Sequence, residues 1–321
     1  MNMCFYRRSK LRSPLVSVII PAYNSERWIR NTLCSVQRQT IENIEIIVVD
    51  DGSSDTTRTI ASDVAESDDR IVIISQNNQG VGAARNSGIS VARGCYIAPI
   101  DSDDLWHPMK LQKQLEAMHR AGPKTGLVYC LSKPVGESGE SLGPAPIWSP
   151  TGNVLHAILH GNFIGNGSSP LIRKSVLQVA GSYLTREQQG GAEGCEDWDL
   201  YIRIAEKSGF EVVREELTFY RQSGSCMSNS VESMIRSFRN VLSRARVRNS
   251  EFGSEIFRSA EANFCAYLGS RCLRSGDYNV CIGLLVRFSA DNVLVCLDRR
   301  LRLLLVRSLI CVVKSKTIGI I

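Results

Sequence analysis

The 321-residue chain lacks long hydrophobic runs: no charge-free apolar segment reaches the roughly 18 residues that a membrane-spanning helix requires. No apolar segment of the secretory-signal type precedes Pro14, where the N-terminus instead carries Arg7, Arg8 and Lys10. The 11 cysteines are scattered, and no two have the C-x-x-C spacing of a zinc site or a redox dithiol. Together these absences predict a cytoplasmic protein of a reducing compartment.

A large excess of charge of one sign is also missing, because the formal net charge is only +6. The charge is unevenly distributed, however: the residues from Arg221 onward carry 16 Lys/Arg against 7 Asp/Glu, a balance of +9. A basic C-terminal third predicts an anionic surface as its partner. Nucleic acid is not expected there, because no aromatic residues alternate with the arginines as stacking platforms.

The acidic group formed by Asp101, Asp103 and Asp104 is the most informative local feature. It follows Tyr96–Ile100, an apolar run typical of a buried strand. Clustered carboxylates repel one another unless a cation or a proton offsets their charge. Mg²⁺ is commonly held by one or two carboxylates together with substrate phosphates. The cluster therefore predicts a metal–diphosphate site, and the alternative is a solvated acidic turn.

Three earlier apolar runs, each short enough to be a buried strand, alternate with segments of helical periodicity. They are Leu15–Ile20, Ile44–Val49 and Ile71–Ile74. This alternation predicts βαβ units and a parallel sheet covered by helices on both faces. Ligands of such sheets bind at the carboxyl ends of the strands. Because Asn24, Asp50 and the acidic cluster all follow strand ends, a nucleotide site is expected at this edge.

Six short motifs follow one another over residues 16–201. They are Val18–Asn24, Gln39-Thr40, Ile47–Asp55, Asn78–Gly88, Asp101–Asp104 and Gly194–Leu200. Each is weak alone, but in this order and spacing they resemble the family 2 glycosyltransferases, which are inverting enzymes that use nucleotide-sugars. The resemblance implies an α/β protein of the GT-A fold: a Rossmann-like, mostly parallel sheet flanked by helices, with a C-terminal helical extension.

The resemblance also implies roles for individual residues. The nucleotide would be bound by Pro21, Tyr23, Asn24, Asp50, Gly80, Arg85 and Asp101. Asp103 would hold a divalent cation, Mn²⁺ or Mg²⁺, and Asp197 would be the general base that deprotonates the acceptor hydroxyl. Asp104, Glu196 and Trp198 would support these two residues. An inverting transfer needs both a base for the acceptor and a cation for the departing diphosphate.

The resemblance has two departures. The segment Leu217–Ser225 lacks the His that many relatives carry there, so Arg221 or solvent would replace a metal ligand from this loop. The Q-x-x-R-W signature of processive polysaccharide synthases is absent, which favours the transfer of single sugars. Taken without the other motifs, Glu196-Asp197 is also typical of the first turn of an ordinary helix, where carboxylates interact favourably with the dipole.

The predicted organisation is a catalytic domain over residues 1–222 and a helical region over 223–321. The catalytic domain would have a nucleotide-sugar half at about 15–105 and an acceptor half at about 106–222. The expected reaction moves one sugar from a nucleotide-diphosphate sugar, a UDP-sugar first of all, to a glycan or lipid-linked acceptor of cell-envelope polysaccharide biosynthesis. The alternatives are a non-catalytic, glycosyltransferase-like binding subunit and a sugar nucleotidyltransferase. The latter usually opens with a Gly-rich basic loop, which Pro21–Asn24 is not.

The C-terminal third has two interpretations of equal weight. Its segment Leu284–Val313 is apolar but interrupted by Arg287, Arg299, Arg300, Arg302 and Arg307. Such a pattern suits a helix that lies on a membrane surface, here at the inner face of the membrane. It suits a helical subdomain packed on the catalytic domain equally well.

Overall fold

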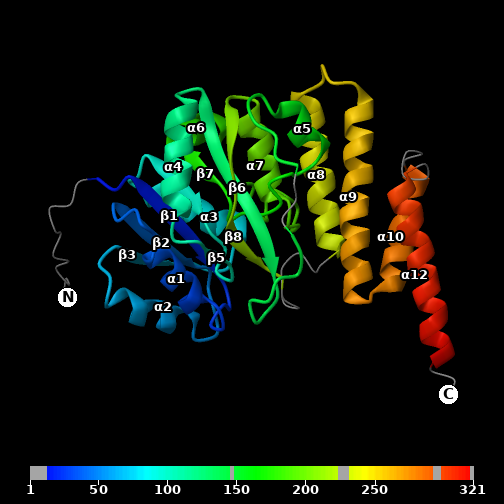
Figure 1. Cartoon of the computed structure of the whole chain (residues 1–321), viewed down its shortest axis with the longest axis horizontal. Helices are drawn as coiled ribbons and strands as arrows, with labels where there is room; N and C mark the ends of the chain where they lie inside the picture. Colours follow the sequence, from blue (N-terminus) through cyan, green and yellow to red (C-terminus); the bar gives the residue numbers. More distant parts are fainter. Residues whose placement is uncertain (1–12, 145–147, 223–230, 292–297, 319–321) are drawn as a thin grey trace. The chain divides into compact units, whose positions relative to one another are not determined.

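The computed structural model describes residues 13–144, 148–222, 231–291 and 298–318, without the side chains of residues 290, 291 and 313–318 (Figure 1). The chain forms two compact units. The first comprises Met1–Val154 and Phe163–Val241, and the second Leu155–Asn162 and Leu242–Ile321. The functional boundary at residue 222 that the sequence predicts lies within the first unit and stays a prediction.

An eight-stranded sheet forms the centre of the first unit, in the order β3-β2-β1-β4-β7-β6-β8-β5. The strands are β1 Val16–Ala22, β2 Ile44–Asp50, β3 Ile71–Ser75, β4 Tyr96–Pro99, β5 Leu105–Trp106, β6 Thr125–Val135, β7 Leu171–Arg173 and β8 Gly209–Arg221. Strands β3, β2, β1 and β4 are mutually parallel, as are β6 and β8, whereas β7 and β5 run antiparallel to their neighbours. The four strands predicted in the first hundred residues and the mostly parallel sheet are thereby confirmed.

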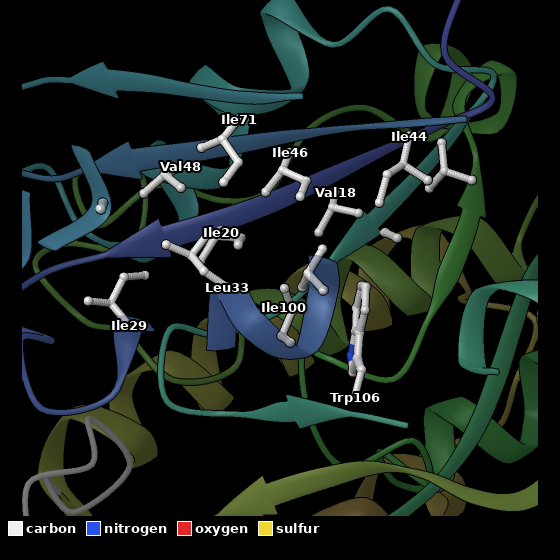
Figure 2. Packing of buried hydrophobic residues seen from close by; sticks show 14 of the residues in the cluster. Val18, Ile20, Ile29, Leu33, Ile44, Ile46, Val48, Ile71, Ile100 and Trp106 are labelled. Atoms are coloured by element: carbon white, nitrogen blue, oxygen red, sulfur yellow. The ribbon is translucent and has the colours of Figure 1, made fainter. Parts of the chain in front are cut away.

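Helices cover both faces of this sheet. The first unit contains α1 Ile29–Gln37, α2 Thr57–Ala65, α3 Val81–Val91, α4 Lys110–Ala121, α6 Lys174–Ala180, α7 Glu196–Ala205 and the start of α8 Val231–Arg248. Successive strand residues point to opposite faces, so Val18 and Ile20 of β1 share one side. Figure 2 shows them packed with Ile29 and Leu33 of α1 in a cluster that is closed to solvent.

The opposite face of β1 receives α3, and a glycine determines how closely the two approach. A Cβ atom on Gly88 would lie 2.6 Å from Cγ2 of Ile19 and 3.2 Å from Cγ2 of Val49. Any larger residue would push α3 away from the sheet, because such distances are below van der Waals contact. The close packing thus fixes α3, and with it Arg85, against the central strands.

The segment after β6 forms the hairpin that its Pro, Gly and Ser content predicts. Val135 pairs with Ser141 in an antiparallel bridge, and the Leu142 backbone N–H donates to the Pro134 carbonyl at 2.9 Å. Residues 145–147 of the predicted loop lie outside the described residues.

The second unit is helical. It contains α5 Leu155–His160, the end of α8, α9 Ser254–Ser275, α10 Tyr278–Asp291 and α12 Arg299–Ile318. The prediction of one continuous helical stripe over Leu284–Val313 is wrong, because α10 ends at Asp291 and α12 begins at Arg299. Helices α9, α10 and α12 pack against one another. Among the helices that the structure describes, none has the length and apolar content needed to cross a bilayer.

Candidate active site

The loops that follow β1 and β2 are joined through Asn24. Its Oδ1 accepts a hydrogen bond from the Ser54 backbone N–H at 2.9 Å, and its own N–H donates to Ser53 Oγ at 3.0 Å. Asn24 has a φ of +47°, a left-handed conformation that Asn tolerates better than most residues. The preceding Tyr23 is 51% exposed at this strand edge. The two loops therefore form one polar rim with an aromatic side chain open to a ligand.

The aspartates at the end of β2 differ in what they hold. The Asp50 carboxylate accepts the Ser53 N–H at 3.1 Å and stabilises its own loop. The Asp51 carboxylate instead accepts the backbone N–H groups of Gln79 at 2.9 Å and Gly80 at 2.8 Å, which lie just before α3. Sequence reasoning assigned no role to Asp51. Its only signal is its place as second member of the Asp50-Asp51 doublet.

Gly80 sits where no other residue fits. Its φ is +89°, and a Cβ atom would lie 2.1 Å from Oε1 of Glu193. The same Glu193 oxygen accepts the Val81 N–H at 3.2 Å. The first amides of α3 are thus bound by the carboxylates of Asp51 and Glu193, so Gly80 shapes this turn through its backbone.

Arg85 connects the two acidic motifs of the site. Its Nη2 donates to Oδ1 of Asp101 at 2.6 Å, and its Nη1 donates to Oε1 of Glu196 at 2.8 Å. The guanidinium is 3% exposed and lies over the ring of Tyr183, 5.1 Å from the centroid. Two carboxylates around one buried cation raise the pKa of Arg85 despite its burial. Arg85, expected from the resemblance to approach the nucleotide, is bound between these two carboxylates.

The acidic loop after β4 contains carboxylates in two different environments. Asp104 is fully buried: its Oδ2 accepts the Ser168 hydroxyl at 2.5 Å, and its Oδ1 accepts the Arg221 N–H at 2.8 Å. Asp101 and Asp103 are partly exposed. Burial, followed by repulsion from Asp101, raises the pKa of Asp103 to about 6. Asp104 therefore anchors the loop, and the other two carboxylates remain accessible.

The loop before β7 supports this acidic loop from below. Ser168 Oγ, besides binding Asp104, accepts the Asp101 backbone N–H at 2.9 Å. Asn166 Oδ1 accepts the N–H groups of Ser168 at 3.0 Å and Ser169 at 2.9 Å. The sequence predicted an acceptor-facing loop over Gly161–Ser169, but Asn166, Ser168 and Ser169 are buried. The small polar run Asn166–Ser169 is the only sequence signal for this buried scaffold.

Arg221, at the end of β8, contacts the acidic loop through its backbone. Its Nε donates to the Asp103 carbonyl at 2.8 Å, and its Nη1 donates to the carbonyls of Gly136 and Glu137 at 3.0 and 2.6 Å. The guanidinium also stacks 4.2 Å from the ring centroid of Trp28. Arg221 thus occupies the place for which the sequence predicted a substitute for a missing His, and these bonds position the segment that carries Asp103.

The base motif lies at the start of α7. Glu196 is 5% exposed, binds Arg85 and accepts the Gly194 N–H at 3.0 Å through its second oxygen. Asp197 is only partly buried. Burial, followed by repulsion from Glu196, raises the pKa of Asp197 to about 7, while Arg85 opposes this shift. Such a pKa makes Asp197 a proton acceptor near neutrality.

Trp198 and Tyr183 complete the surroundings of Asp197. Trp198 is 3% exposed and stacks on Phe238 of α8, with ring centroids 5.4 Å apart. It supports the site by packing α7 rather than by facing a ligand. The buried Tyr183 hydroxyl has no hydrogen-bond partner among the residues that the structure describes. Its burial raises the pKa of Tyr183, so it carries its proton beside Arg85.

Comparison of the sequence with known proteins gives consistent matches. The sequence profile described as "Glycosyl transferase family 2" matches residues 17–177. EpsH of Bacillus subtilis, described as a glycosyltransferase, is 38% identical over 174 residues, which are 53% of this chain and 50% of that protein. TuaG of B. subtilis, described as a glycosyltransferase of teichuronic acid biosynthesis, is 46% identical over 106 residues, 33% of this chain and 42% of that protein. The chain thus spans about half the length of these relatives, or less.

Solved structures resemble the chain over most of its length. A fragment of S. aureus TarS in complex with UDP-GlcNAc has a TM-score of 0.61 at 18% identity, covering 85% of this chain and 80% of that one. The mannosyltransferase PcManGT from Pyrobaculum calidifontis, in complex with GDP-Man and Mn²⁺, has a TM-score of 0.55 at 16% identity, covering 94% and 86%. At such identities the likeness concerns the fold, and it confirms the predicted GT-A architecture.

Proposed function

Because the chain belongs to glycosyl transferase family 2, we propose that it transfers a single hexosyl group from a nucleotide-diphosphate sugar to an acceptor hydroxyl with inversion. The observation that carries this proposal is the pair of bonds made by Arg85. One guanidinium binds Asp101 of the donor-side loop and Glu196 of the base motif. Residues that are far apart in the sequence, and that have complementary roles in such a reaction, are thereby joined in one site.

The protein's own contribution to the chemistry is a base in a defined position. Asp197, next to the engaged Glu196, would accept the proton of the acceptor hydroxyl. The acceptor oxygen then forms a bond to the anomeric carbon while the bond from that carbon to the diphosphate breaks, which inverts the configuration. A carboxylate with a pKa of about 7 suits this task, because a base works best when its pKa is close to the working pH.

The acidic loop fits a divalent cation. Asp103 and Asp101 present hard carboxylate oxygens, the ligands that Mg²⁺ and Mn²⁺ prefer. Within the described residues no group of three or more His, Cys, Asp or Glu could hold a metal alone. A cation at Asp103 would therefore share its coordination with donor phosphates. When bound, it would neutralise charge on the departing diphosphate. Asp104 and Arg221 would hold Asp103 in place.

The donor and acceptor are proposed from chemistry and from similarity. The exposed Tyr23, with Pro21, Asn24 and Asp50 at the same strand edge, would line the base and ribose of a UDP-sugar. Structural neighbours contain UDP-GlcNAc, UDP or GDP-Man, which supports a nucleotide-sugar. We propose a glycan or lipid-linked acceptor of a surface polysaccharide, in keeping with the description of TuaG.

The second unit would bring the enzyme to a lipid-borne acceptor at the inner face of the membrane. It carries arginines and exposed apolar side chains on the same helix, among them Arg302, Leu303 and Val306 of α12. Apolar burial and attraction to anionic lipid together favour such peripheral attachment. The catalytic region over residues 1–222 would not depend on it for donor binding.

The reaction is tested by incubating the protein with a panel of nucleotide-sugars and Mn²⁺ and identifying the products by mass spectrometry. Release of UDP, dependent on one donor and abolished by Asp197→Asn, is the expected result. Release of pyrophosphate would instead identify a nucleotidyltransferase. Donor binding by calorimetry without any turnover, for every acceptor extract supplied, would identify a binding subunit.

A further inference from the structure

The second unit contains a groove between two of its helices. The groove has a volume of about 550 Å³ and is lined by Asn263, Ala266, Tyr267, Ser270, Arg274, Arg300, Leu303, Leu304 and Arg307. It belongs to α9 and α12 and shares no residue with the site described above. None of the described side chains that line it is acidic.

The spacing of the lining residues explains the groove. On α12, Arg300, Leu303, Leu304 and Arg307 recur at intervals of three and four, so they form one stripe of the helix. The α9 residues Asn263, Ala266, Tyr267, Ser270 and Arg274 form a matching stripe. Figure 1 shows α9 and α12 running in the same direction, with α10 between them in sequence. Two stripes that face each other leave a channel along both helices.

One hydrogen bond sets the register of the two stripes. Arg300 Nη2 donates to Asn263 Oδ1 at 2.8 Å, which places these residues at the same level. Equal rise along parallel helices then puts Arg307 level with Ser270, and Arg274 about one turn, roughly 6 Å, further on. The charges of Arg307 and Arg274 therefore meet at one end of the groove, next to the Ser270 hydroxyl.

The arginines of the groove differ in how far their charge is neutralised. Arg300 is paired with Asp298 at 2.6 Å, and its role is to join the helices. Arg274 and Arg307 are exposed and have no hydrogen bond or ion pair to any other described residue. Tyr267 Oη accepts a hydrogen bond from Arg271 at 3.0 Å, which leaves its own proton available to donate. This set of donors suits a phosphate group.

The remainder of the groove is apolar. Leu303 is 49% exposed and Leu304 is buried, and both stand beside the arginine end. The same helix exposes Val306, Leu309 and Ile310 outside the groove. Uncovered apolar side chains next to unneutralised arginines match a molecule that joins a phosphate to a hydrocarbon chain. Free phosphate would leave the apolar wall in contact with water.

We propose that the groove between α9 and α12 binds the phosphate headgroup of an anionic lipid, with Arg274 and Arg307 on the phosphate and Leu303 beside the first part of the chain. This inference rests on the proposed membrane attachment, which it deepens by naming a headgroup site. It concerns a stereochemically defined pocket, in contrast to general attraction between a basic surface and anionic lipid.

The test measures binding of a soluble lipid phosphate to the full chain by isothermal titration calorimetry. Dihexanoyl phosphatidic acid, kept below its micellar concentration, is expected to bind with 1:1 stoichiometry. Inorganic phosphate is expected to bind at least about tenfold more weakly, because it cannot cover the apolar wall. Arg274→Gln/Arg307→Gln should weaken lipid binding by about 10- to 100-fold. The matched control Arg299→Gln/Arg302→Gln removes the same charge from exposed positions of α12 outside the groove, and should bind as the wild type does.

A second variant separates the two parts of the ligand. Leu303→Asn changes no charge, and should weaken binding of the short-chain lipid while leaving that of inorganic phosphate unchanged. The proposal is overturned if the groove variant binds the lipid as well as the wild type, or if the control loses as much. Equal affinity for inorganic phosphate would overturn the lipid as ligand. Thermal melts verify that each variant is folded.

Vesicle co-sedimentation distinguishes this proposal from membrane attachment itself. Vesicles with phosphatidic acid should bind the wild type better than vesicles with phosphatidylserine of equal charge density, and the groove variant should lose that preference. If the groove variant pellets with both vesicles as the wild type does, attachment stands and the headgroup site is wrong. If calorimetry shows the site but no vesicle pellets the protein, the site stands and attachment is wrong.

Discussion

The two acidic clusters of the active site share a plan, and their difference predicts what each does. In both, one carboxylate is buried and fully bound: Asp104 after β4 and Glu196 at the start of α7. The neighbouring carboxylate, Asp103 or Asp197, is partly exposed. The buried member fixes the backbone, and the exposed member beside it is left for the ligand.

The clusters differ in what lies next to the exposed member. Asp103 has a second partly exposed carboxylate close by, Asp101, whose charge raises the pKa of Asp103 to about 6. Two carboxylates that share an edge are stabilised by a divalent cation. The exposed Asp197 adjoins a carboxylate already bound to Arg85, and its pKa is raised to about 7. The first arrangement suits a metal, and the second suits a proton.

The largest effect is expected from Asp103→Asn, which removes one of the two shared charges. Transfer should fall to the background rate, because the amide binds a divalent cation far more weakly than a carboxylate does. The melting temperature should change little, since Asp103 is partly exposed. Initial rates of UDP release with and without EDTA measure this, and EDTA should inhibit the wild type. Full activity in EDTA would contradict the metal assignment.

Asp197→Asn should lower kcat by about 10²- to 10⁴-fold, the range expected when a general base is removed. Binding of the donor should remain, because the donor-side residues Asp50, Asp101 and Arg85 are unchanged. Steady-state kinetics and donor titration by calorimetry measure the two effects separately. Loss of donor binding in this variant would place Asp197 on the donor side of the site.

The pH profile sharpens the same comparison with a smaller change. The base acts in its ionised form, and a raised pKa means that this form is lost as the pH falls through about 7. The value of kcat/KM should therefore decrease about tenfold per pH unit below that pKa and level off above it. In Asp197→Asn this limb should be absent. A limb near the ordinary pKa of aspartate would show that Asp197 is solvated in the working enzyme.

The donor side of this site could be predicted from the sequence because its signals are local. Apolar runs such as Ile44–Val49 are long enough for one buried strand, and the polar residues that follow them must then meet at one sheet edge. The register of β1 with β2 and β4 needs no information beyond these runs. The GT-A fold and the convergence of Asp50 and Asp101 at one edge follow from the same argument.

The supporting contacts could not be predicted, because each joins distant segments through one or two bonds. Ser168 reaches Asp104 over 64 positions, and Arg221 reaches the Asp103 carbonyl over 118. Nothing in the composition around Ser168 marks it as buried. Likewise, Leu155–His160 joins the second unit although the chain on both sides belongs to the first. Local periodicity carries no information on such pairings.

The smallest loss of activity is expected from Asp104→Asn, the same substitution as Asp103→Asn one position along the chain. The new amide oxygen can still accept the Arg221 N–H, but its NH₂ group would meet Ser168 Oγ, which now donates to this position. One buried hydrogen bond would be reversed or lost, at a cost of about 1–3 kcal/mol in the free energy of unfolding. Activity should fall by only about 10-fold, through a small displacement of the loop.

Urea unfolding of the two variants, together with their rates of UDP release, gives the decisive pairing. If the buried carboxylate positions and the exposed one binds, Asp104→Asn loses stability and keeps activity, whereas Asp103→Asn keeps stability and loses activity. Serine 168 offers a check from the other side of the bond: Ser168→Ala should destabilise the protein as Asp104→Asn does. Loss of all activity in a stable Asp104→Asn protein would make Asp104 itself the metal ligand, and the division of roles between neighbouring carboxylates would then be wrong.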